Sequence, residues 1–470
     1  MFQITLDELV KVVQGETLLG HYARDQMISG ISIDSRKIGK GNLFVAIAGD
    51  RFDGHQFVKQ ALNKGAQATV IAKDKNHTID QEVFNKIAVI LVQDTKKALR
   101  DMASWHRKKF DIPAVAVTGT NGKTTTKDMI AEVLSSRFKV LKSPKSYNNL
   151  IGVPLTLFQL NSSSEALVVE LGMSSPGEIG ILTKISNPDI GVITNIGPAH
   201  LESMQSVEKI AKAKFELPDN MSSPKTLILN ADDCILAKRI KQKKEDERLI
   251  SFGIINKADF VADRIEMNGD GYISFRANKD LTIKLGLLGI HNVYNALAAF
   301  AVGSLIEVDP QEIKQKLERY TPSELRMELV QIGNIRVIND SYNANPVSME
   351  KALETLNAIK TPGRKIAVLG DMLELGEKSI DFHLEVGRKA AQFGVDLLVV
   401  VGELARLIGE GAKKAGMNSG DILTFENNQK VSFYLLENLK EGDLVLVKGS
   451  RKMKTEEVVL SLKSQFRRQN

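Results

Sequence analysis

Short apolar runs alternate with longer mixed stretches over most of the chain. Each run is almost wholly apolar, which is typical of parallel strands buried on both faces of a sheet. The stretches between them favour helices. The alternation therefore predicts an α/β protein built from strand–helix units. The clearest runs are AVAVT (114–118), ALVVELG (166–172), IGVITNIG (190–197) and TLILNA (226–231).

The alternation falls into three blocks. The first, residues 1–110, is predicted to be a small α/β unit. Pro113 separates it from the second block, residues 111–320, for which we expect a parallel sheet. The third, residues 321–470, repeats the alternation in KIAVLGD, DLLVVVG and DLVLVKGS, which indicates an open, doubly wound sheet of the Rossmann-like kind. A chain of 470 residues is too long for one ordinary core, so several domains are expected.

The strand AVAVT leads into a glycine-rich turn and then into a helix-like sequence. A strand, a glycine loop and a helix N-terminus together bind anions, because backbone N–H groups and the helix dipole face the phosphate oxygens. Lys123 is expected to reach the terminal phosphates, and the Thr124 hydroxyl to bind Mg²⁺. Val117 stands where the usual phosphate loop has its first glycine, and an ordinary tight turn is the alternative. The residues expected to bind ATP here are Gly119, Thr120, Asn121, Gly122, Lys123, Thr124 and Thr125.

Composition narrows the classes of function. An apolar content of 43% with 26% charged residues is ordinary for a soluble globular protein. One cysteine, Cys234, excludes an internal disulfide and fits a reducing compartment. The N-terminal sequence lacks the basic region of a signal peptide, and no apolar run approaches the roughly 20 residues of a membrane span. We therefore expect a cytoplasmic protein without stable membrane insertion. The net charge of +6 suits acidic small molecules, and without a basic stripe among aromatics we expect no nucleic-acid partner.

Catalytic candidates are expected at the carboxyl ends of the strands. Glu170 ends one strand, where a carboxylate can hold the metal of a nucleotide; a solvent-facing strand end is the alternative. His200 follows another strand, and a structural or surface histidine is the more common reading. Lys214 lies in the helix-like stretch VEKIAKAKFEL, whose spacing alone indicates a solvated face.

Several longer motifs occur in one order along the chain. They resemble the Mur ligases, the ATP-dependent enzymes that form amide bonds in peptidoglycan synthesis. The segments DSYNANP, GDMLELG and VKGSRKMKTEEVV are similar to those of the member that adds D-alanyl-D-alanine. The motifs that carry the resemblance are TGTNGKTTT, YNNLIGVP (147–154), ELGMSSPGEI (170–179), NIGPAHLE (195–202), AKAKFEL, GIHNVYNALAA (289–299) and DSYNANP (340–346).

The resemblance implies three domains. The first binds the UDP-sugar, the central one binds ATP, and the C-terminal one contributes to binding of the nucleotide and the amino substrate. It also implies an acyl-phosphate intermediate and two Mg²⁺ ions. Thr124 and Glu170 then belong to the first metal and His200 to the second. Lys214 becomes a carbamylated lysine, and Lys123, Lys214 and His200 are the catalytic residues. The residues implied for the rest of the nucleotide are Asn292 and Asn295 for adenine, with Arg326 for phosphate and Asp340 for ribose.

The implied substrates are UDP-N-acetylmuramoyl-tripeptide and D-alanyl-D-alanine, bound by a monomer. Ser35 and Arg36 are similar to the uridine-nucleotide segment, although a local backbone cap at this turn is an alternative. Asn148, Asn149 and Thr156 resemble positions along the sugar-peptide channel, with ordinary loop chemistry as a strong competitor. The residues similar to amino-substrate and hinge elements are Asn343, Asn345, Lys448, Ser450 and Arg451.

Two other readings stay open. The nearest is a sibling ligase, either the one that adds the third-position diamino acid of the peptide or the one that adds glutamate to folate. Against these stand the separate first block and the DSYNANP segment. The more distant reading is a phosphate-loop binding or switch protein, which would not need Glu170, His200 and Lys214. The sequence leaves open whether the tripeptide ends in lysine or diaminopimelate.

Overall fold

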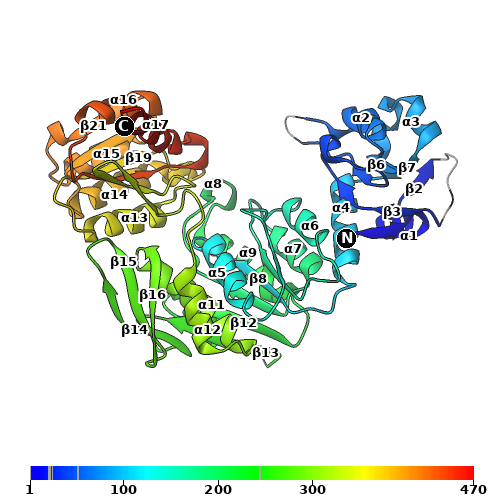
Figure 1. The fold of residues 1–470 in the computed structure, drawn as a ribbon, viewed down its shortest axis with the longest axis horizontal. Coiled ribbons are helices and arrows are strands. Elements are labelled where there is room, and N and C mark those ends of the chain that lie inside the picture. The colour runs from blue at the N-terminus through cyan, green and yellow to red at the C-terminus, as the bar shows by residue number, and fades with distance from the viewer. Residues whose placement is uncertain (1, 19–22, 24, 50–51, 243–244, 470) are drawn as a thin grey trace.

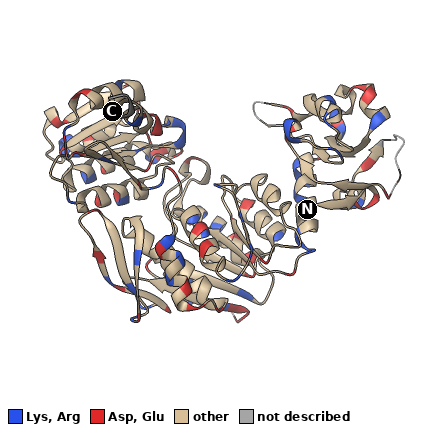
Figure 2. Ribbon diagram, viewed as in Figure 1, with Lys and Arg blue, Asp and Glu red and all other residues tan. Residues whose placement is uncertain are grey.

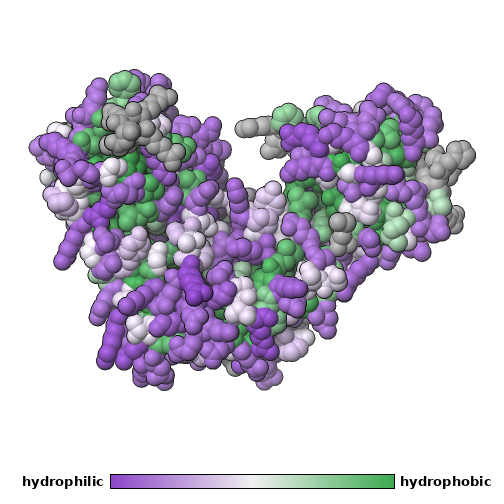
Figure 3. All heavy atoms as spheres, in the orientation of Figure 1, coloured by the Kyte–Doolittle hydropathy of each residue, from purple (hydrophilic) through white to green (hydrophobic). Residues whose placement is uncertain are grey.

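A computed structural model describes residues 2–18, 23, 25–49, 52–242 and 245–469. Three units follow one another along the chain (Figure 1). The central unit (cyan to green) lies between the N-terminal unit (blue) and the C-terminal unit (yellow to red), and the two outer units stand apart. A space-filling view shows the surface hollowed between the outer units (Figure 3).

The N-terminal unit contains a sheet in the order β2-β7-β6-β5-β4, parallel except for β2, and a small β1-β3 pair. Its last helix, α4, joins it to the central unit. The buried Arg107 guanidinium on α4 donates to the Ser186 carbonyl at 3.0 Å, which ties the two units together. The elements are β1 Gln3–Thr5, α1 Leu6–Val13, β2 Glu16–Leu18, β3 Met27–Ser29, β4 Ile31–Ser32, η1 Ser35–Lys37, β5 Leu43–Val45, η2 Gly54–Phe57, α2 Val58–Asn63, β6 Ala68–Ala72, η3 Lys73–Thr78, α3 Gln81–Lys86, β7 Ala88–Val92 and α4 Thr95–Arg107.

The central unit is built on a sheet in the order β16-β15-β14-β13-β12-β11-β8-β10-β9. In β8, Ala114 and Ala116 join one core, and Val115 and Val117 join the core on the opposite face. Burial on both faces explains why this strand has no polar alternation. The elements are β8 Ala114–Thr118, α5 Lys123–Leu134, β9 Val140–Lys142, α6 Gly152–Leu157, β10 Ala166–Glu170, α7 Glu178–Ser186, β11 Ile190–Ile193, α8 Leu201–Met204, α9 Val207–Asn220, β12 Lys225–Asn230, α10 Cys234–Lys241, β13 Glu247–Gly253, β14 Phe260–Met267, β15 Tyr272–Ala277, β16 Leu281–Leu288, α11 His291–Leu305 and α12 Pro310–Arg319.

The expected parallel sheet of the central unit continues at one edge into antiparallel strands. The sheet is parallel from β9 to β14, but β14, β15 and β16 pair antiparallel. Along β15, buried and partly exposed residues alternate, as in a strand with one covered face. This period-two pattern is visible in YISFRA (272–277), and the search for wholly apolar runs missed it.

The C-terminal unit contains a sheet in the order β17-β18-β22-β19-β20-β21. It is parallel except for the edge strand β17, which pairs antiparallel with β18. The three runs noted in the sequence form β19, β20 and β22. The elements are β17 Glu328–Ile332, β18 Ile335–Asn339, α13 Pro346–Ala358, β19 Lys365–Gly370, η4 Gly376–Lys378, α14 Ser379–Gln392, β20 Leu397–Val401, α15 Arg406–Lys414, η5 Ser419–Asp421, β21 Ile422–Phe425, α16 Asn428–Asn438, β22 Leu444–Lys448, η6 Arg451–Met453 and α17 Glu456–Gln469.

Charged residues of both signs are interspersed over all three units (Figure 2). None of the helices in the described part of the chain combines the length and apolar content needed to cross a membrane.

Candidate functional site

A cavity of about 790 Å³ opens between the central and C-terminal units. The central unit contributes the glycine loop 119–125 and the carboxyl end of β10. The C-terminal unit contributes residues of the segments 340–348, 373–375 and 448–452. Residues far apart in the sequence therefore meet at one site, at the carboxyl ends of parallel strands, where α/β proteins bind ligands.

The loop between β8 and α5 has two positions that need glycine. Gly119 has a φ of +146°, and a Cβ there would lie 1.9 Å from the Thr194 hydroxyl oxygen. Gly122 has a φ of +81°, and its Cβ would lie 2.4 Å from Oδ1 of Asn295. A side chain at either position would push the loop out of its conformation. The loop ends where α5 begins at Lys123, so backbone N–H groups at the helix start face the cavity, as an anion site requires.

Two lysines converge on the carbonyl oxygen of Gly119. Lys123 Nζ donates to it at 2.9 Å and Lys214 Nζ at 2.8 Å. Burial, together with the neighbouring charge of Lys123, holds the pKa of Lys214 well below that of an ordinary lysine. Burial also lowers the pKa of Lys123, and the nearby Glu170 carboxylate opposes that shift. The solvated face indicated by spacing is wrong for Lys214, which is 4% exposed, whereas Lys212 on the same helix is exposed.

Glu170 is buried at the end of β10 and does not face solvent. Its Oε2 accepts a hydrogen bond from the Thr124 hydroxyl at 2.7 Å, and its Oε1 accepts one from the Asn148 amide at 2.7 Å. A carboxylate and a hydroxyl oxygen beside a phosphate loop are the hard oxygen donors that Mg²⁺ prefers. These two residues therefore fit a magnesium ion bound with a nucleotide.

The other two channel candidates have local roles in this structure. The Asn149 side chain accepts from the backbone N–H groups of Ile151 and Gly152, at 3.1 and 2.8 Å, and so stabilises the start of α6. Thr156 is fully buried inside α6, and its hydroxyl donates to the Gly152 carbonyl. In this structure the Thr156 hydroxyl thus bonds within its own helix, and its place along the sugar-peptide channel stays a prediction.

His200 lines the cavity but contacts the C-terminal unit. Its Nδ1 lies 2.6 Å from a carboxylate oxygen of Glu374, which belongs to the GDMLELG segment. The histidine adopts a left-handed backbone, with a φ of +54°. Over the described ranges, no group of three or more His, Cys, Asp or Glu side chains is gathered as a metal cluster. Any second metal at His200 would need oxygen ligands from elsewhere.

The nucleotide candidates of the central unit lie directly behind the loop. Asn295 accepts from the Thr126 hydroxyl at 3.0 Å and donates to Asn292 at 2.8 Å. Asn292 in turn donates to the Leu288 carbonyl. Both asparagines are 5% exposed and line the cavity. Their side-chain contacts fasten the start of α11 to α5, the helix that follows the phosphate loop, and to the end of β16.

The two remaining nucleotide candidates approach from the C-terminal side. The Arg326 guanidinium donates to the Thr124 hydroxyl at 3.1 Å, so a cation lies against the phosphate loop. Asp340 follows β18 and accepts from Lys448 Nζ at 2.5 Å and from the Met327 N–H at 3.2 Å. The structure thus places Arg326 against Thr124 of the glycine loop and pairs Asp340 with Lys448.

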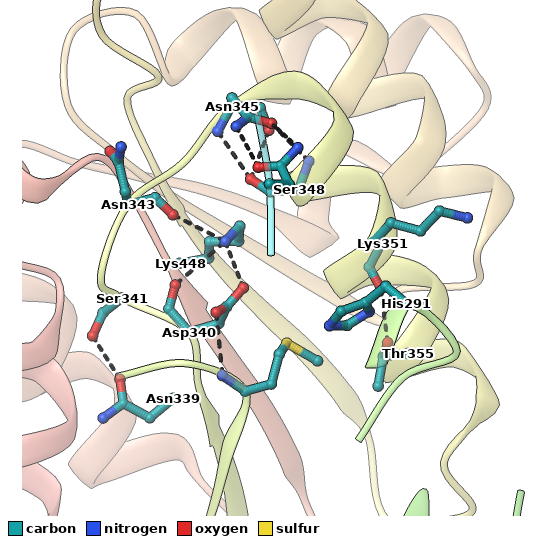
Figure 4. Close-up of polar contacts among 12 residues, drawn as sticks. His291, Asn339, Asp340, Ser341, Asn343, Asn345, Ser348, Lys351, Thr355 and Lys448 are labelled. Atoms are coloured by element: carbon teal, nitrogen blue, oxygen red, sulfur yellow. Dashed lines mark hydrogen bonds and ion pairs between the residues drawn. The ribbon is translucent and has the colours of Figure 1, made fainter. Parts of the chain in front are cut away.

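The five amino-substrate candidates form one cluster. Figure 4 shows Asp340 and Asn343 on either side of the Lys448 ammonium, which also donates to the Asn343 carbonyl at 3.0 Å. Asn345 caps α13 by accepting from the Ser348 N–H, and its amide donates to Asn121 of the phosphate loop at 2.8 Å. The backbone N–H of Arg451 donates to the Asn343 side chain, and the Ser450 hydroxyl accepts from the N–H of Leu373.

Ser35 and Arg36 lie in the N-terminal unit, outside the cavity lining. Asp34 caps the short helix η1, as the local-cap alternative holds. The Arg36 side chain is 78% exposed, and its guanidinium makes two hydrogen bonds of 2.9 Å to Asp34, which lower the pKa of that carboxyl to about 2. The buried Ser35 hydroxyl donates to Gln60 at 2.6 Å. The structure does not bring this pair together with the nucleotide candidates.

Sequence reasoning missed two residues near the cavity, Lys127 and Tyr342. Lys127 is fully buried, and its ammonium donates to the carbonyls of Ser143 and Lys145, at 2.8 and 3.0 Å. Tyr342 of the C-terminal unit donates to the Ser146 hydroxyl at 2.5 Å. The signal for Tyr342 was its place inside DSYNANP. Nothing in the sequence distinguishes Lys127 from a surface lysine.

Comparison with known proteins adds evidence over the whole chain. Three family models match: the Mur ligase family catalytic domain at residues 27–107, the Mur ligase middle domain at 117–303, and the Mur ligase glutamate ligase domain at 325–451. A curated relative from Bacillus subtilis, UDP-N-acetylmuramoyl-tripeptide–D-alanyl-D-alanine ligase, is 34% identical over 463 residues, which cover 98% of this chain and 99% of the relative.

Two solved structures extend this likeness to the fold. A crystal structure of MurF from Acinetobacter baumannii has a TM-score of 0.89 and 30% identity, covering 99% of both chains. A structure of MurF from Thermotoga maritima in complex with ADP has a TM-score of 0.82 and 28% identity, covering 94% of this chain and 98% of that one. The expected three-domain α/β fold is therefore confirmed.

Proposed function

The chain belongs to the Mur ligase family, and we propose that it joins D-alanyl-D-alanine to UDP-N-acetylmuramoyl-tripeptide with ATP, in the synthesis of the peptidoglycan precursor. One observation carries the proposal: the phosphate loop 119–125 faces the DSYNANP segment 340–346 across a single cavity. The curated relatives named for this reaction match along the full chain, which argues against the folate and diamino-acid siblings and against a pure switch protein.

Three domains divide the work in this proposal. Residues 1–110 bind the UDP-sugar, 111–320 bind ATP, and 321–470 close over the nucleotide and bind the amino substrate. In the first domain, Ser35 and Arg36 hold the diphosphate of the UDP-sugar, for which an exposed guanidinium is suited. Asn148 and Asn149 border the path of the peptide to the cavity. We further propose that the protein acts as a monomer in the cytoplasm.

The reaction needs activation of a carboxylate, because its leaving group would otherwise be oxide. Transfer of the γ-phosphoryl group of ATP to the terminal carboxylate of the tripeptide gives an acyl phosphate and ADP. The amine of D-alanyl-D-alanine then attacks the acyl carbon, the carbon–oxygen bond to phosphate breaks, and the amine loses a proton. Lys123 and Arg326 face the position where negative charge builds up on the phosphoryl oxygens, so both lower the barrier electrostatically.

We propose Mg²⁺ at Thr124 and Glu170, with a second ion towards His200. When bound, Mg²⁺ neutralises phosphate charge and polarises phosphoryl oxygens. Lys214 fits the role of a carbamate in this site, because the reaction with CO₂ uses the neutral amine and releases one proton. Its lowered pKa favours that neutral form. The product is an anionic oxygen group, whereas an ammonium would repel the ions.

The remaining candidates surround the nucleotide and the amino substrate. Asn292 and Asn295 hold the adenine side of the cavity, and Asp340 holds the ribose. Lys448 keeps Asp340 in place through their 2.5 Å contact. Asn343, Asn345, Ser450 and Arg451 line the side from which D-alanyl-D-alanine enters.

Phosphate release tests the proposed function. With ATP and Mg²⁺, the purified chain is expected to release phosphate only when both UDP-N-acetylmuramoyl-tripeptide and D-alanyl-D-alanine are present. A matched panel exchanges lysine for diaminopimelate in the tripeptide and replaces D-alanyl-D-alanine by L-alanyl-L-alanine or glutamate. The assignment would be overturned if phosphate release were the same when one of the two substrates is left out, or when glutamate replaces D-alanyl-D-alanine.

A further inference from the structure

A closed ring of contacts joins the phosphate loop to the C-terminal unit. It begins at Tyr342, whose hydroxyl donates to the Ser146 hydroxyl at 2.5 Å. Ser146 belongs to the loop that follows β9, and its carbonyl accepts from the Asn148 N–H at 2.8 Å. The Asn148 amide then donates to Glu170 at 2.7 Å. Tyr342 is thus three contacts away from the carboxylate at the end of β10.

The ring returns to Tyr342 by a second route. Glu170 accepts from the Thr124 hydroxyl at 2.7 Å, and that hydroxyl accepts from the Arg326 guanidinium at 3.1 Å. The guanidinium carbon lies 3.9 Å from the centre of the Tyr342 ring, within the range of a cation–π contact. Tyr342 therefore contacts Glu170 indirectly on both sides, through its hydroxyl and through its ring.

The loop that carries Ser146 and Asn148 is held firmly at its base. The buried Lys127 ammonium donates to the carbonyls of Ser143 and Lys145, which fixes the loop to the phosphate-loop helix α5. Near its other end, a Cβ on Gly172 would come within 2.9 Å of the Asn148 amide, so the loop is packed closely against the chain after β10. The Gly172 N–H also donates to the Asn148 carbonyl at 2.8 Å, and Tyr342 adds the contact at Ser146, whose carbonyl accepts from the Asn148 N–H.

We propose that Tyr342 is a positioning residue that couples docking of the C-terminal unit to the orientation of Glu170, through Ser146 and Asn148. This proposal rests on the proposed ligase function. When the C-terminal unit docks, the Tyr342 hydroxyl reaches Ser146, and Arg326, held against the Tyr342 ring, reaches Thr124, so Glu170 and Thr124 are oriented together. When the unit undocks, the contacts of Tyr342 with Ser146 and of Arg326 with Thr124 are both withdrawn. The nucleotide site is then complete only while the unit that brings the amine is in place.

A double-mutant cycle tests the coupling. Tyr342→Phe removes the hydroxyl bond and keeps the ring against Arg326, and Ser146→Ala removes the same bond from the other side. We expect each to lower kcat about tenfold, as for loss of one positioning hydrogen bond, with an unchanged KM for D-alanyl-D-alanine. The double variant is expected to equal the single variants, because all three lack one shared bond. Tyr434→Phe, on α16 and outside the cavity lining, is the matched control and is expected to keep wild-type rates.

Hydrogen–deuterium exchange provides a readout that does not depend on ligase activity. In Tyr342→Phe and in Ser146→Ala, peptides covering 143–152 are expected to exchange faster than in the wild-type protein, while Tyr434→Phe leaves them unchanged. Multiplied losses in the double variant, a raised KM for D-alanyl-D-alanine at unchanged kcat, or unchanged exchange of this loop would each overturn the coupling. A wild-type chain without ligation would refute the proposed function instead, and the exchange result would still decide the coupling.

Discussion

The N-terminal unit and the cavity between the other two units each carry a short polar motif that follows a strand, and the two motifs have different surroundings. Lys123 lies among Glu170, Arg326 and Lys214 from different elements. Arg36 is largely exposed, and its guanidinium donates to Asp34 of its own turn. The groups around Lys123 are thus gathered from several elements in this structure, whereas the UDP-sugar candidates are the buried Ser35 and the exposed Arg36, at a distance from them.

This difference suggests how the two regions divide the reaction. A preassembled site stabilises charge in the transition state without reorganising, so its residues should affect turnover. An exposed arginine that contacts only the bound substrate should affect the KM for that substrate and leave kcat unchanged. The following substitutions test that division, from the largest expected effect to the smallest.

Lys123→Ala should have the largest effect. The ammonium faces the phosphate position and contributes little to core packing, so the fold should be kept while turnover falls on the order of 10³-fold. Steady-state kinetics together with a melting curve measure both. Activity within tenfold of the wild-type chain would contradict the assignment of the phosphate loop.

Lys214→Ala should come next, with a loss of roughly 10²-fold, because it removes the proposed anionic group from the same site. Small carboxylates such as formate or acetate should restore part of the activity by occupying the vacated position. Lys212→Ala, two residues away and exposed, is the matched control and should show neither loss nor rescue. Loss without any rescue, and without the extra mass of a carboxyl group under bicarbonate, would leave Lys214 as an ordinary buried lysine.

Arg36→Ala should have a smaller effect of a different kind. We expect KM for the UDP-tripeptide to rise about tenfold while kcat and KM for ATP stay unchanged, because the lost contact is equal in the ground and transition states. Lys37→Ala, an exposed neighbour in the same turn, is the control. An unchanged KM would leave Arg36 as the partner of Asp34 alone.

The sequence predicted much of the fold, for physical reasons that also explain what it missed. Strands buried on both faces, such as β8 and β10, are continuous apolar runs and were found directly. The strands β14 to β16 have one exposed face, so their weaker alternating signal was overlooked. The edge strand β21 is only partly buried and was missed for a similar reason.

The candidate site was predictable where local pattern and chemistry coincide. The glycine loop can be recognised in the sequence because Gly119 and Gly122 adopt backbone conformations that favour glycine. Burial of Lys214 and Lys127 depends on elements distant in sequence, so helical spacing could not reveal it. Likewise, the contact between Tyr342 and Ser146 exists only because the C-terminal unit docks on the central one.

Small-angle scattering tests most directly whether the N-terminal unit and the cavity between the other two units serve one reaction. The amine and the acyl phosphate must meet with water excluded, so the N-terminal unit and the C-terminal unit have to close around the bound substrates. The joins near Pro113 and near Thr321-Pro322 are the expected hinges. We predict a smaller radius of gyration with a non-hydrolysable ATP analogue and UDP-tripeptide together than with neither ligand, and an intermediate one with either alone. An unchanged radius when both ligands are saturating would contradict this account.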